Sequence, residues 1–184
     1  MLTSYLGKTV LSAIVLDHII PRPTPVNNSA HIIYYYCSHK AGTEKNTYLE
    51  LIRELLAQLA AHDEDLVHYL LDERNQSSVP LSLARCEILF KKAIQIAVQP
   101  DERLYMVIDG LDELPANDRK QFLRYMEKLA VPSQSTTSPG SLVANKLCVY
   151  ISSRNIPDIK KFMDSKRNGW GKLPVVSLAI ESKV

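Results

Sequence analysis

The sequence has few cysteines, little net charge and no long apolar run. Its three cysteines, Cys37, Cys86 and Cys148, lie far apart, and each falls inside an apolar stretch. We therefore expect buried thiols in a reducing compartment, the cytoplasm, rather than a disulfide framework or a cysteine metal site. The net charge is only +2, so there is no general electrostatic case for binding nucleic acid or an anionic membrane.

The sequence also shows no segment typical of secretion or membrane insertion. The most apolar early run, residues 10–20, contains Asp17 and is too short to span a bilayer. We expect neither a signal peptide nor a membrane span, and we find no internal repeat. Hydrophobic residues make up 46% of the 184 residues, which suits a single globular domain over residues 1–184 with one sizeable core.

The most informative stretch, residues 104–113, is an apolar run that ends in three carboxylates. Apolar residues precede Asp109, and Asp112 and Glu113 follow the glycine at position 110. Such a run is typical of a buried parallel strand, and ligands gather at the carboxyl ends of parallel strands. Asp109 is placed to hold a hydrated Mg²⁺, whereas Asp112 or Glu113 could orient or deprotonate a water. The alternative is a strand followed by a polar surface loop.

A candidate phosphate site stands at Gly7, Lys8 and Thr9. The apolar run at residues 10–20 follows directly, so we expect a buried helix that starts at these residues and ends near residue 20. Helix amides that face an anion, the Lys8 ammonium on the phosphates and the Thr9 hydroxyl on Mg²⁺ make up the distal half of a P-loop. The tripeptide by itself is weak evidence for a P-loop. The evidence is strengthened by the predicted strand that ends in Asp109 about a hundred residues later.

The front half of this loop lacks its glycine. The P-loop pattern puts a glycine five positions before Gly7, where this chain has Leu2, and Tyr5 and Leu6 fill positions that small residues usually occupy. The sequence also leaves no room for the apolar strand that should precede the loop. We therefore expect a degenerate Walker A segment over residues 2–9, a missing first strand, and very weak or undetectable binding of Mg-ATP.

The other patterns predict alternating strands and helices. Aromatic and β-branched residues predict a strand over residues 30–38, and a capping box at Thr47 predicts a helix with one apolar face. In a helix over residues 118–130, we place Arg119 on the polar side. The further predicted elements are a short helix around residues 66–71, a helix after Ser82 with apolar positions 86, 89, 90, 93, 94 and 97, a surface loop over 131–145, a buried strand over 147–154, a short helix from Pro157 and a last strand over 175–180.

Arg154 ends the predicted strand over residues 147–154. Its guanidinium could bind a terminal phosphate presented beside the neighbouring strand, because arginine recognises phosphate through paired hydrogen bonds. It could instead pair with a surface acid, and for an arginine considered alone we favour this second interpretation.

Three blocks, residues 7–12, 105–113 and 147–159, together resemble the NACHT class of signal-transducing P-loop NTPases. The resemblance is strongest to the nephrocystin-like N-terminal domain of fungal NOD-like receptor proteins, which belong to the STAND group, and it covers almost the whole chain. The distinctive element is Asp-Gly-x-Asp-Glu at residues 109–113. The resemblance implies a three-layer α/β P-loop NTPase fold, a parallel sheet with helices on both faces, and here we expect its first strand to be missing.

The resemblance also implies a role for each candidate residue. The implied groups are Gly7, Lys8, Thr9 and Arg154 on the nucleotide, Thr9 and Asp109 on Mg²⁺, and Asp112 or Glu113 as the water-activating base. ATP and Mg²⁺ would be the cofactors of an ATP-dependent signalling switch that forms homotypic or receptor-like oligomers. We expect impaired activity in an N-terminally truncated fragment of a longer receptor, with a short degenerate homologue as the alternative. A non-catalytic protein-interaction module without nucleotide binding is the alternative function.

Overall fold

The computed structural model describes residues 6–19, 30–38, 47–75, 82–97, 102–130 and 147–166. Its elements are α1 (Leu6–Ile19), β1 (Ala30–Tyr36), α2 (Tyr48–Ala60), α3 (Glu64–Asn75), α4 (Leu83–Ala97), β2 (Arg103–Asp109), the 3₁₀ helix η1 (Leu111–Glu113), α5 (Ala116–Ala130), β3 (Leu147–Ile151) and α7 (Pro157–Lys166). The front of the predicted loop at residues 2–5, the surface loop over 131–145 and the last strand over 175–180 lie outside the described residues.

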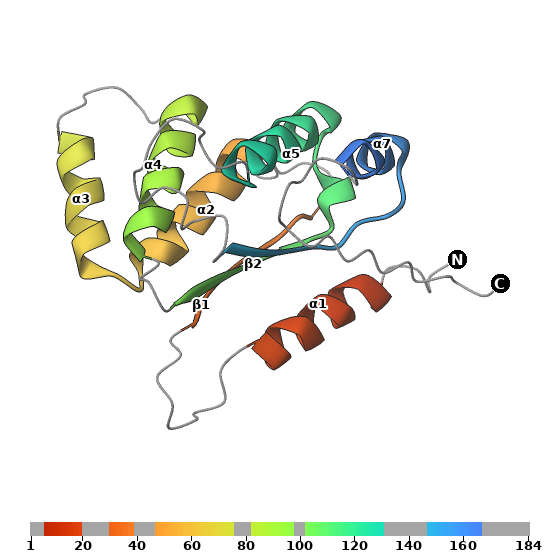
Figure 1. The fold of residues 1–184 in the computed structure, drawn as a ribbon, viewed down its shortest axis with the longest axis horizontal. Coiled ribbons are helices and arrows are strands. Elements are labelled where there is room, and N and C mark those ends of the chain that lie inside the picture. The colour runs from red at the N-terminus through yellow and green to blue at the C-terminus, as the bar shows by residue number, and fades with distance from the viewer. Residues whose placement is uncertain are drawn as a thin grey trace.

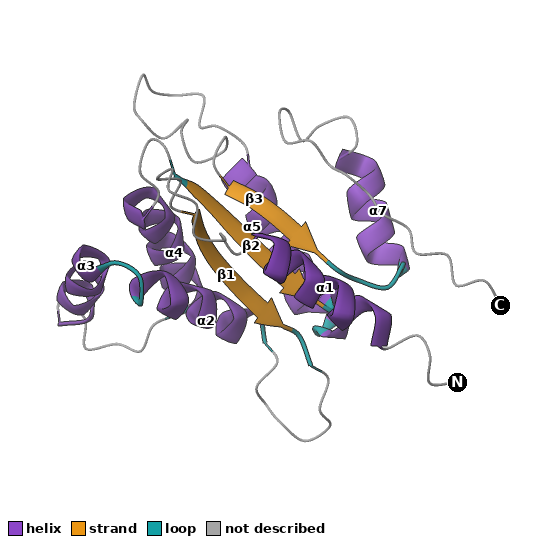
Figure 2. Ribbon diagram, turned by 90° about the horizontal axis from the view of Figure 1, so that it is seen from below, coloured by secondary structure: helices purple, strands orange, loops and turns teal. Residues whose placement is uncertain are grey.

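The three strands β1, β2 and β3 form one parallel sheet in that order. Their register aligns the carboxyl ends, since Tyr36 lies opposite Asp109 and Ile151 lies opposite Ile108. Figure 1 shows α2, α4 and α5 on one side of this sheet and α1 on the other. Figure 2, a view from below, shows α1 in front of the sheet, over the end of β2. The predicted α/β class with a parallel sheet is confirmed, and the arrangement is compatible with a P-loop fold.

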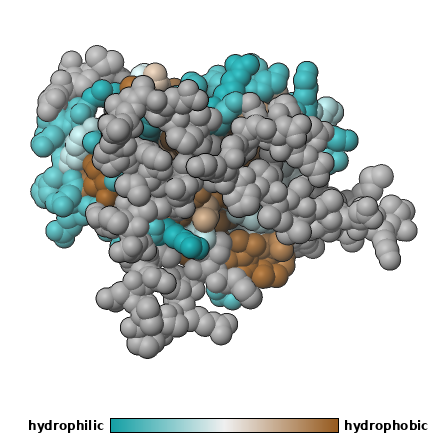
Figure 3. Space-filling view, in the orientation of Figure 1, coloured by the Kyte–Doolittle hydropathy of each residue, from teal (hydrophilic) through white to brown (hydrophobic). Residues whose placement is uncertain are grey.

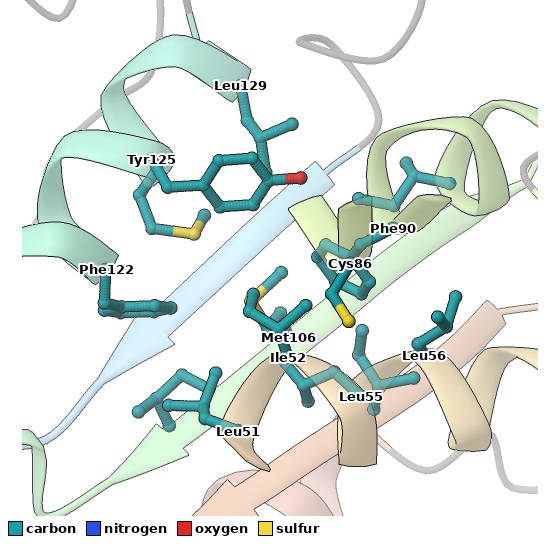
Figure 4. Close-up of a cluster of buried hydrophobic side chains, with 14 of the residues drawn as sticks. Leu51, Ile52, Leu55, Leu56, Cys86, Phe90, Met106, Phe122, Tyr125 and Leu129 are labelled. Carbon is teal, nitrogen blue, oxygen red and sulfur yellow. The ribbon is translucent and has the colours of Figure 1, made fainter. Parts of the chain in front are cut away.

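The main core lies between the sheet and the layer of α2, α4 and α5. Helix α2 begins as predicted, because the Thr47 hydroxyl accepts a hydrogen bond of 3.3 Å from the Glu50 amide. Every apolar position predicted for α4 is buried, as expected for a helix with one apolar face. Figure 4 labels side chains of this core: Leu51, Ile52, Leu55, Leu56, Cys86, Phe90, Met106, Phe122, Tyr125 and Leu129.

Helix α1 is not buried nearly all round, so that prediction is wrong. Val10 and Ile14 are 52% and 51% exposed, whereas Ser12 is fully buried. Figure 3 shows hydrophobic residues at the surface at the place of α1. Helix α1 contacts β2 on one side only and is the one described helix on its face of the sheet, so no described helix covers its outer side. No helix in the described ranges is both long and apolar enough to cross a membrane.

Strand β3 is less buried than predicted, because it lies at an edge of the described sheet. Leu147 at its start is buried, but Cys148 is exposed. An edge strand has a neighbour on one side only, which leaves part of it open to solvent. The prediction of a buried thiol is therefore wrong for Cys148, and it is confirmed for Cys37 and Cys86.

Arg119 of α5 is buried, against the prediction that placed it on the polar face. It is 8% exposed, and its Nε and Nη2 donate to Asp158 Oδ2 of α7 at 2.9 and 2.8 Å. Its Nη1 donates to the backbone carbonyls of Asp112 and Leu114 at 3.1 and 2.7 Å. Helical spacing locates the base of a side chain, but the long stem of arginine can carry its charge elsewhere. Arg119 thus ties α5 to η1 and α7.

Replacing Arg119 by alanine should lower the free energy of unfolding by about 2–4 kcal/mol, because it removes the donor given above for the Leu114 carbonyl and for Oδ2 of Asp158. Arg124 is exposed on the same helix, so Arg124→Ala should change this free energy by less than about 0.5 kcal/mol. Urea unfolding followed by circular dichroism compares the two variants. Equal, small effects would contradict a stabilising role for the buried guanidinium.

The contribution of the Arg119–Asp158 pair should depend on pH. Partial burial raises the pKa of Asp158, but the hydrogen bonds and charge of Arg119 outweigh burial and lower this pKa below its usual value. A carboxyl whose pKa is lower in the folded state adds stability above its unfolded pKa and loses it as pH falls through its folded pKa. The stability difference between the native chain and Asp158→Asn should therefore be present at neutral pH and shrink in acid. A difference that grows on acidification would contradict the pairing.

Of the three cysteines, we expect only Cys148 to react rapidly with a thiol reagent at neutral pH. Cys86 is fully buried. Burial, together with the nearby carboxylates of Glu113 and Asp109, raises the pKa of Cys37 to about 12, so the reactive thiolate is scarce. Titration with Ellman's reagent should find one fast thiol in the native protein and three in denaturant. Three fast thiols in the native protein would contradict this packing.

Candidate functional site

Three hydroxyl groups converge on the carboxylate of Asp109, which ends the middle strand of the sheet. Thr9 Oγ1 donates to Asp109 Oδ2 at 2.9 Å, and Ser12 Oγ donates to Asp109 Oδ1 at 2.7 Å. Ser152 Oγ also donates to Oδ1. An ionised carboxylate only accepts hydrogen bonds, so three donors suit it. Helix α1 and the residue after β3 therefore hold this buried acid.

Local structure explains why these hydroxyls meet. Thr9 and Ser12 are three residues apart in α1, so their side chains lie on the same side of the helix. Ser152 follows β3 directly, where its amide donates to the Ile108 carbonyl at 2.9 Å and its carbonyl accepts from the Leu111 amide at 3.0 Å. The parallel pairing of β2 and β3 thus continues past the end of β3 and brings the Ser152 hydroxyl to Asp109.

Gly110 turns the chain away from β2 in a way that few other residues allow. It has a φ of 70° and a ψ of 39°, in the left-handed region that side chains disfavour. A Cβ atom at this position would lie 3.2 Å from the Cys37 carbonyl oxygen. The Gly110 amide donates to the Ser152 hydroxyl at 3.0 Å. This turn leads directly into η1, which carries Asp112 and Glu113.

Asp112 and Arg154 form an ion pair beside this turn. The Arg154 amide donates to Asp112 Oδ1 at 2.8 Å, and its Nε donates to Oδ2. The Asp112 side chain is 1% exposed, whereas that of Arg154 is 47% exposed. The pairing predicted as one of two alternatives for Arg154 is therefore present, but its partner is a buried acid instead of a surface acid. The guanidinium itself remains accessible from solvent.

The structure brings most of the predicted site residues to one end of the sheet. Thr9, Asp109, Asp112 and Arg154 are joined there by the contacts given above, and Glu113 is next to Asp112 in η1. Gly7 and Lys8 lie in the first turn of α1. Their side-chain environments are outside the described part of the structure, so the predicted contact of Lys8 with phosphate remains a prediction.

Sequence reasoning missed Ser12, Ser152 and Arg119. Two features of the sequence could have drawn attention to the serines. Ser12 is a polar residue within the apolar run of α1, and Ser152 stands at the polar end of β3. Both are buried, and a buried hydroxyl needs a hydrogen-bond partner. Neither signal identifies Asp109 as that partner, because the contact joins segments far apart in the chain.

The oxygen donors at this end of the sheet fit Mg²⁺. Mg²⁺ prefers oxygen ligands and usually takes one or two carboxylates from the protein, with phosphates and waters as its other ligands. Thr9 Oγ1 and Asp109 Oδ2 are adjacent and supply such oxygens. Within the described ranges, no group of three or more histidine, cysteine, aspartate or glutamate side chains could hold a metal ion by itself. Thr9 Oγ1 and Asp109 Oδ2 could supply two of the ligands of such an ion.

A family model described as nephrocystin 3, N-terminal, matches residues 5–154. This segment contains every predicted site residue, from Gly7 to Arg154. Searches of curated proteins and of solved structures found no match. The family match confirms the predicted resemblance to a nephrocystin-like N-terminal domain. Because it covers well over half of the 184 residues, the chain belongs to the nephrocystin 3 N-terminal family.

Proposed function

We propose that this domain binds a magnesium nucleotide, ATP, as a NACHT-type P-loop module of a NOD-like receptor protein. The hydrogen bond of 2.9 Å between Thr9 and Asp109, which are 100 positions apart, is the observation that most supports it. In P-loop NTPases, the hydroxyl of the loop and a carboxylate at a strand end both hold Mg²⁺. In this chain, a hydroxyl near the start of a helix and a carboxylate at a strand end are in contact, which supports the proposal.

The proposed phosphate site is the amino-terminal turn of α1. Gly7 and Lys8 lie in this turn, where unpaired helix amides and the helix dipole favour an anion. Lys8 would neutralise the β- and γ-phosphates, and Thr9 and Asp109 would hold the metal. Mg²⁺, when bound, would supply positive charge to the phosphate oxygens.

The contacts support different roles for the two acids after Gly110. The Asp112 carboxylate is almost fully buried and bound to Arg154, so it is poorly placed to reach a water, as a general base must. Its role would be to hold Arg154 beside the site. Glu113 is only partly buried, and we propose that it orients the attacking water. The accessible guanidinium of Arg154 would bind the terminal phosphate.

We expect the affinity of this chain for the nucleotide to be low. A P-loop binds phosphate mainly through converging backbone amides, each worth about 1.5–3 kcal/mol when the bond is charge-assisted. Leu2 replaces the first glycine of the loop, and Tyr5 and Leu6 replace small residues. The loss of two such bonds would weaken binding by several orders of magnitude.

A protein-interaction module is the second candidate function. The observation that favours it is the exposed apolar side of α1, where Val10 and Ile14 are about half exposed. Contiguous apolar surface of this kind is often used for contacts with other proteins. Nucleotide binding distinguishes the two proposals, because an interaction module does not require it.

Titration with a fluorescent ATP analogue, with and without Mg²⁺, tests the first proposal. We expect weak, Mg²⁺-dependent binding that Lys8→Ala, Asp109→Asn and Thr9→Val each weaken by at least about tenfold, because each removes a charged or metal-ligating group. Thr9→Ser keeps the hydroxyl and should bind within about twofold of the native chain. Lys120 is exposed on α5 across the sheet, so Lys120→Ala is the matched control for loss of a positive charge.

Two results would contradict the nucleotide proposal. One is the absence of binding at millimolar Mg-ATP in the native chain, which would favour the interaction module. The other is binding that Lys120→Ala weakens as much as Lys8→Ala does, which would indicate nonspecific attraction to a basic surface.

Phosphate release at saturating Mg-ATP tests the separate roles of the acids. Glu113→Gln should slow turnover about 10²- to 10⁴-fold, because it removes the group that orients the water, and should leave the affinity for Mg-ATP within about twofold. Asp112→Asn should weaken both turnover and affinity, because it releases Arg154. Glu64→Gln on α3, far from the site and exposed, is the control. If Asp112→Asn alone abolishes turnover and Glu113→Gln does not, these roles are reversed.

A further inference from the structure

We propose that Ser12 and Ser152 make the Asp109 site selective for Mg²⁺ over Ca²⁺, by leaving only one oxygen of the Asp109 carboxylate available to a cation. This inference rests on the proposed function, because it concerns the metal that would accompany the nucleotide. Ser12 and Ser152 would act as specificity-determining residues that touch the acid and not the metal.

The two oxygens of Asp109 have unequal partners. Oδ1 accepts hydrogen bonds from both Ser12 Oγ, at 2.7 Å, and Ser152 Oγ. A carboxylate oxygen has about two lone-pair sites, so these bonds fill Oδ1. Oδ2 accepts one bond among those given for the site, from Thr9 at 2.9 Å. Among the contacts of the described residues, Oδ2 is therefore the oxygen with a lone pair to spare, and it lies next to the hydroxyl that is the second proposed metal ligand.

Neither serine can readily leave Oδ1. Ser12 is fully buried on the side of α1 that faces the sheet. Ser152 is also buried, and its hydroxyl accepts the Gly110 amide at 3.0 Å while it donates to Asp109. Its backbone amide and carbonyl bond to Ile108 and Leu111 at 2.9 and 3.0 Å. A rotation of Ser152 would leave the Gly110 amide without its acceptor, and unpaired buried amides are costly.

The difference between the two cations turns on how many carboxylate oxygens they take. Ca²⁺ binds six to eight oxygens in flexible geometry and often takes both oxygens of one carboxylate. Mg²⁺ requires a near-ideal octahedron and keeps several waters, so one oxygen of Asp109 is enough for it. When Oδ1 is filled by two serine hydroxyls, Asp109 cannot bind Ca²⁺ through both oxygens without losing those hydrogen bonds.

The experiment measures the affinity of the full chain for a fluorescent ATP analogue, once with Mg²⁺ and once with Ca²⁺ as the sole divalent cation. We expect the native chain to bind at least about fivefold more tightly with Mg²⁺. Ser12→Ala and Ser152→Ala should each reduce this ratio, and the double variant should bring it close to one, because Oδ1 becomes available to Ca²⁺. Ser12→Thr and Ser152→Thr keep a hydroxyl and should retain the native ratio.

Ser153→Ala is the matched control, because the Ser153 hydroxyl donates to the Arg154 carbonyl at 2.8 Å and no bond to Asp109 is found for it. It should leave the ratio within about twofold of the native value. Thermal melting of each variant identifies any that do not fold. If the alanine variants unfold, the test is the ratio of affinities with Mg²⁺ and Ca²⁺ in the native chain and in the threonine variants.

The outcomes separate this inference from the proposed function. Equal affinity with Mg²⁺ and Ca²⁺ in the native chain, or alanine variants that bind but keep the native ratio, would overturn the selectivity and leave magnesium-nucleotide binding intact. Absence of nucleotide binding with either cation, or binding that needs no cation, would overturn both.

Discussion

The buried carboxylate of Asp109 is the group on which the arrangement of this end of the sheet depends. A buried charge is very costly unless it is hydrogen-bonded or paired, and here hydroxyls from two other segments supply those bonds. Helix α1 must lie across the end of β2 for Thr9 and Ser12 to reach the acid. The segment after β3 must run beside β2 for Ser152 to reach it. The packing that gives the Asp109 carboxylate its hydrogen bonds is therefore the same packing that assembles the candidate site.

Two arginines hold the acidic turn that follows, and their exposure differs. Arg119 is buried and binds backbone carbonyls of the turn together with Asp158 of α7. Arg154 is about half exposed and binds the carboxylate of Asp112. A buried guanidinium with several partners is expected to stay in place, and Arg154 is also expected to keep its acid, because its release would leave the buried Asp112 carboxylate without this partner. The difference leaves one guanidinium buried within the scaffold and one with part of its surface open to solvent.

Local patterns predicted much of the fold. The spacing of apolar residues identified the buried faces of α2 and α4, and the hydroxyls of Thr47 and Ser82 marked where these helices begin. The acid-tipped strand and the class of the sheet also followed from sequence. These features are set by neighbours within one helical turn or one strand, so a single sequence contains the information they need.

Features set by distant segments were predicted less well. The exposure of Val10 depends on which elements cover α1, and that of Cys148 depends on the position of β3 at an edge. The burial of Arg119 depends on acceptors in η1 and α7. The same holds for the candidate site, where Thr9 and Asp109 were each predicted as a Mg²⁺ ligand, but the serines that bind Asp109 were not predicted. Hydrogen bonds between distant segments leave no periodic pattern in the sequence.

The most direct test of the central claim is the position of a paramagnetic cation on the protein. Mn²⁺ and ATP added to the isotopically labelled chain should broaden the amide signals of Thr9, Gly110, Leu111 and Ser152, which surround Asp109, and should leave those of α3, at the far side of the fold (Figure 1), unchanged. Asp109→Asn should abolish this local broadening. Broadening centred on another part of the chain, or unaffected by Asp109→Asn, would contradict a nucleotide-linked metal site at the end of β2.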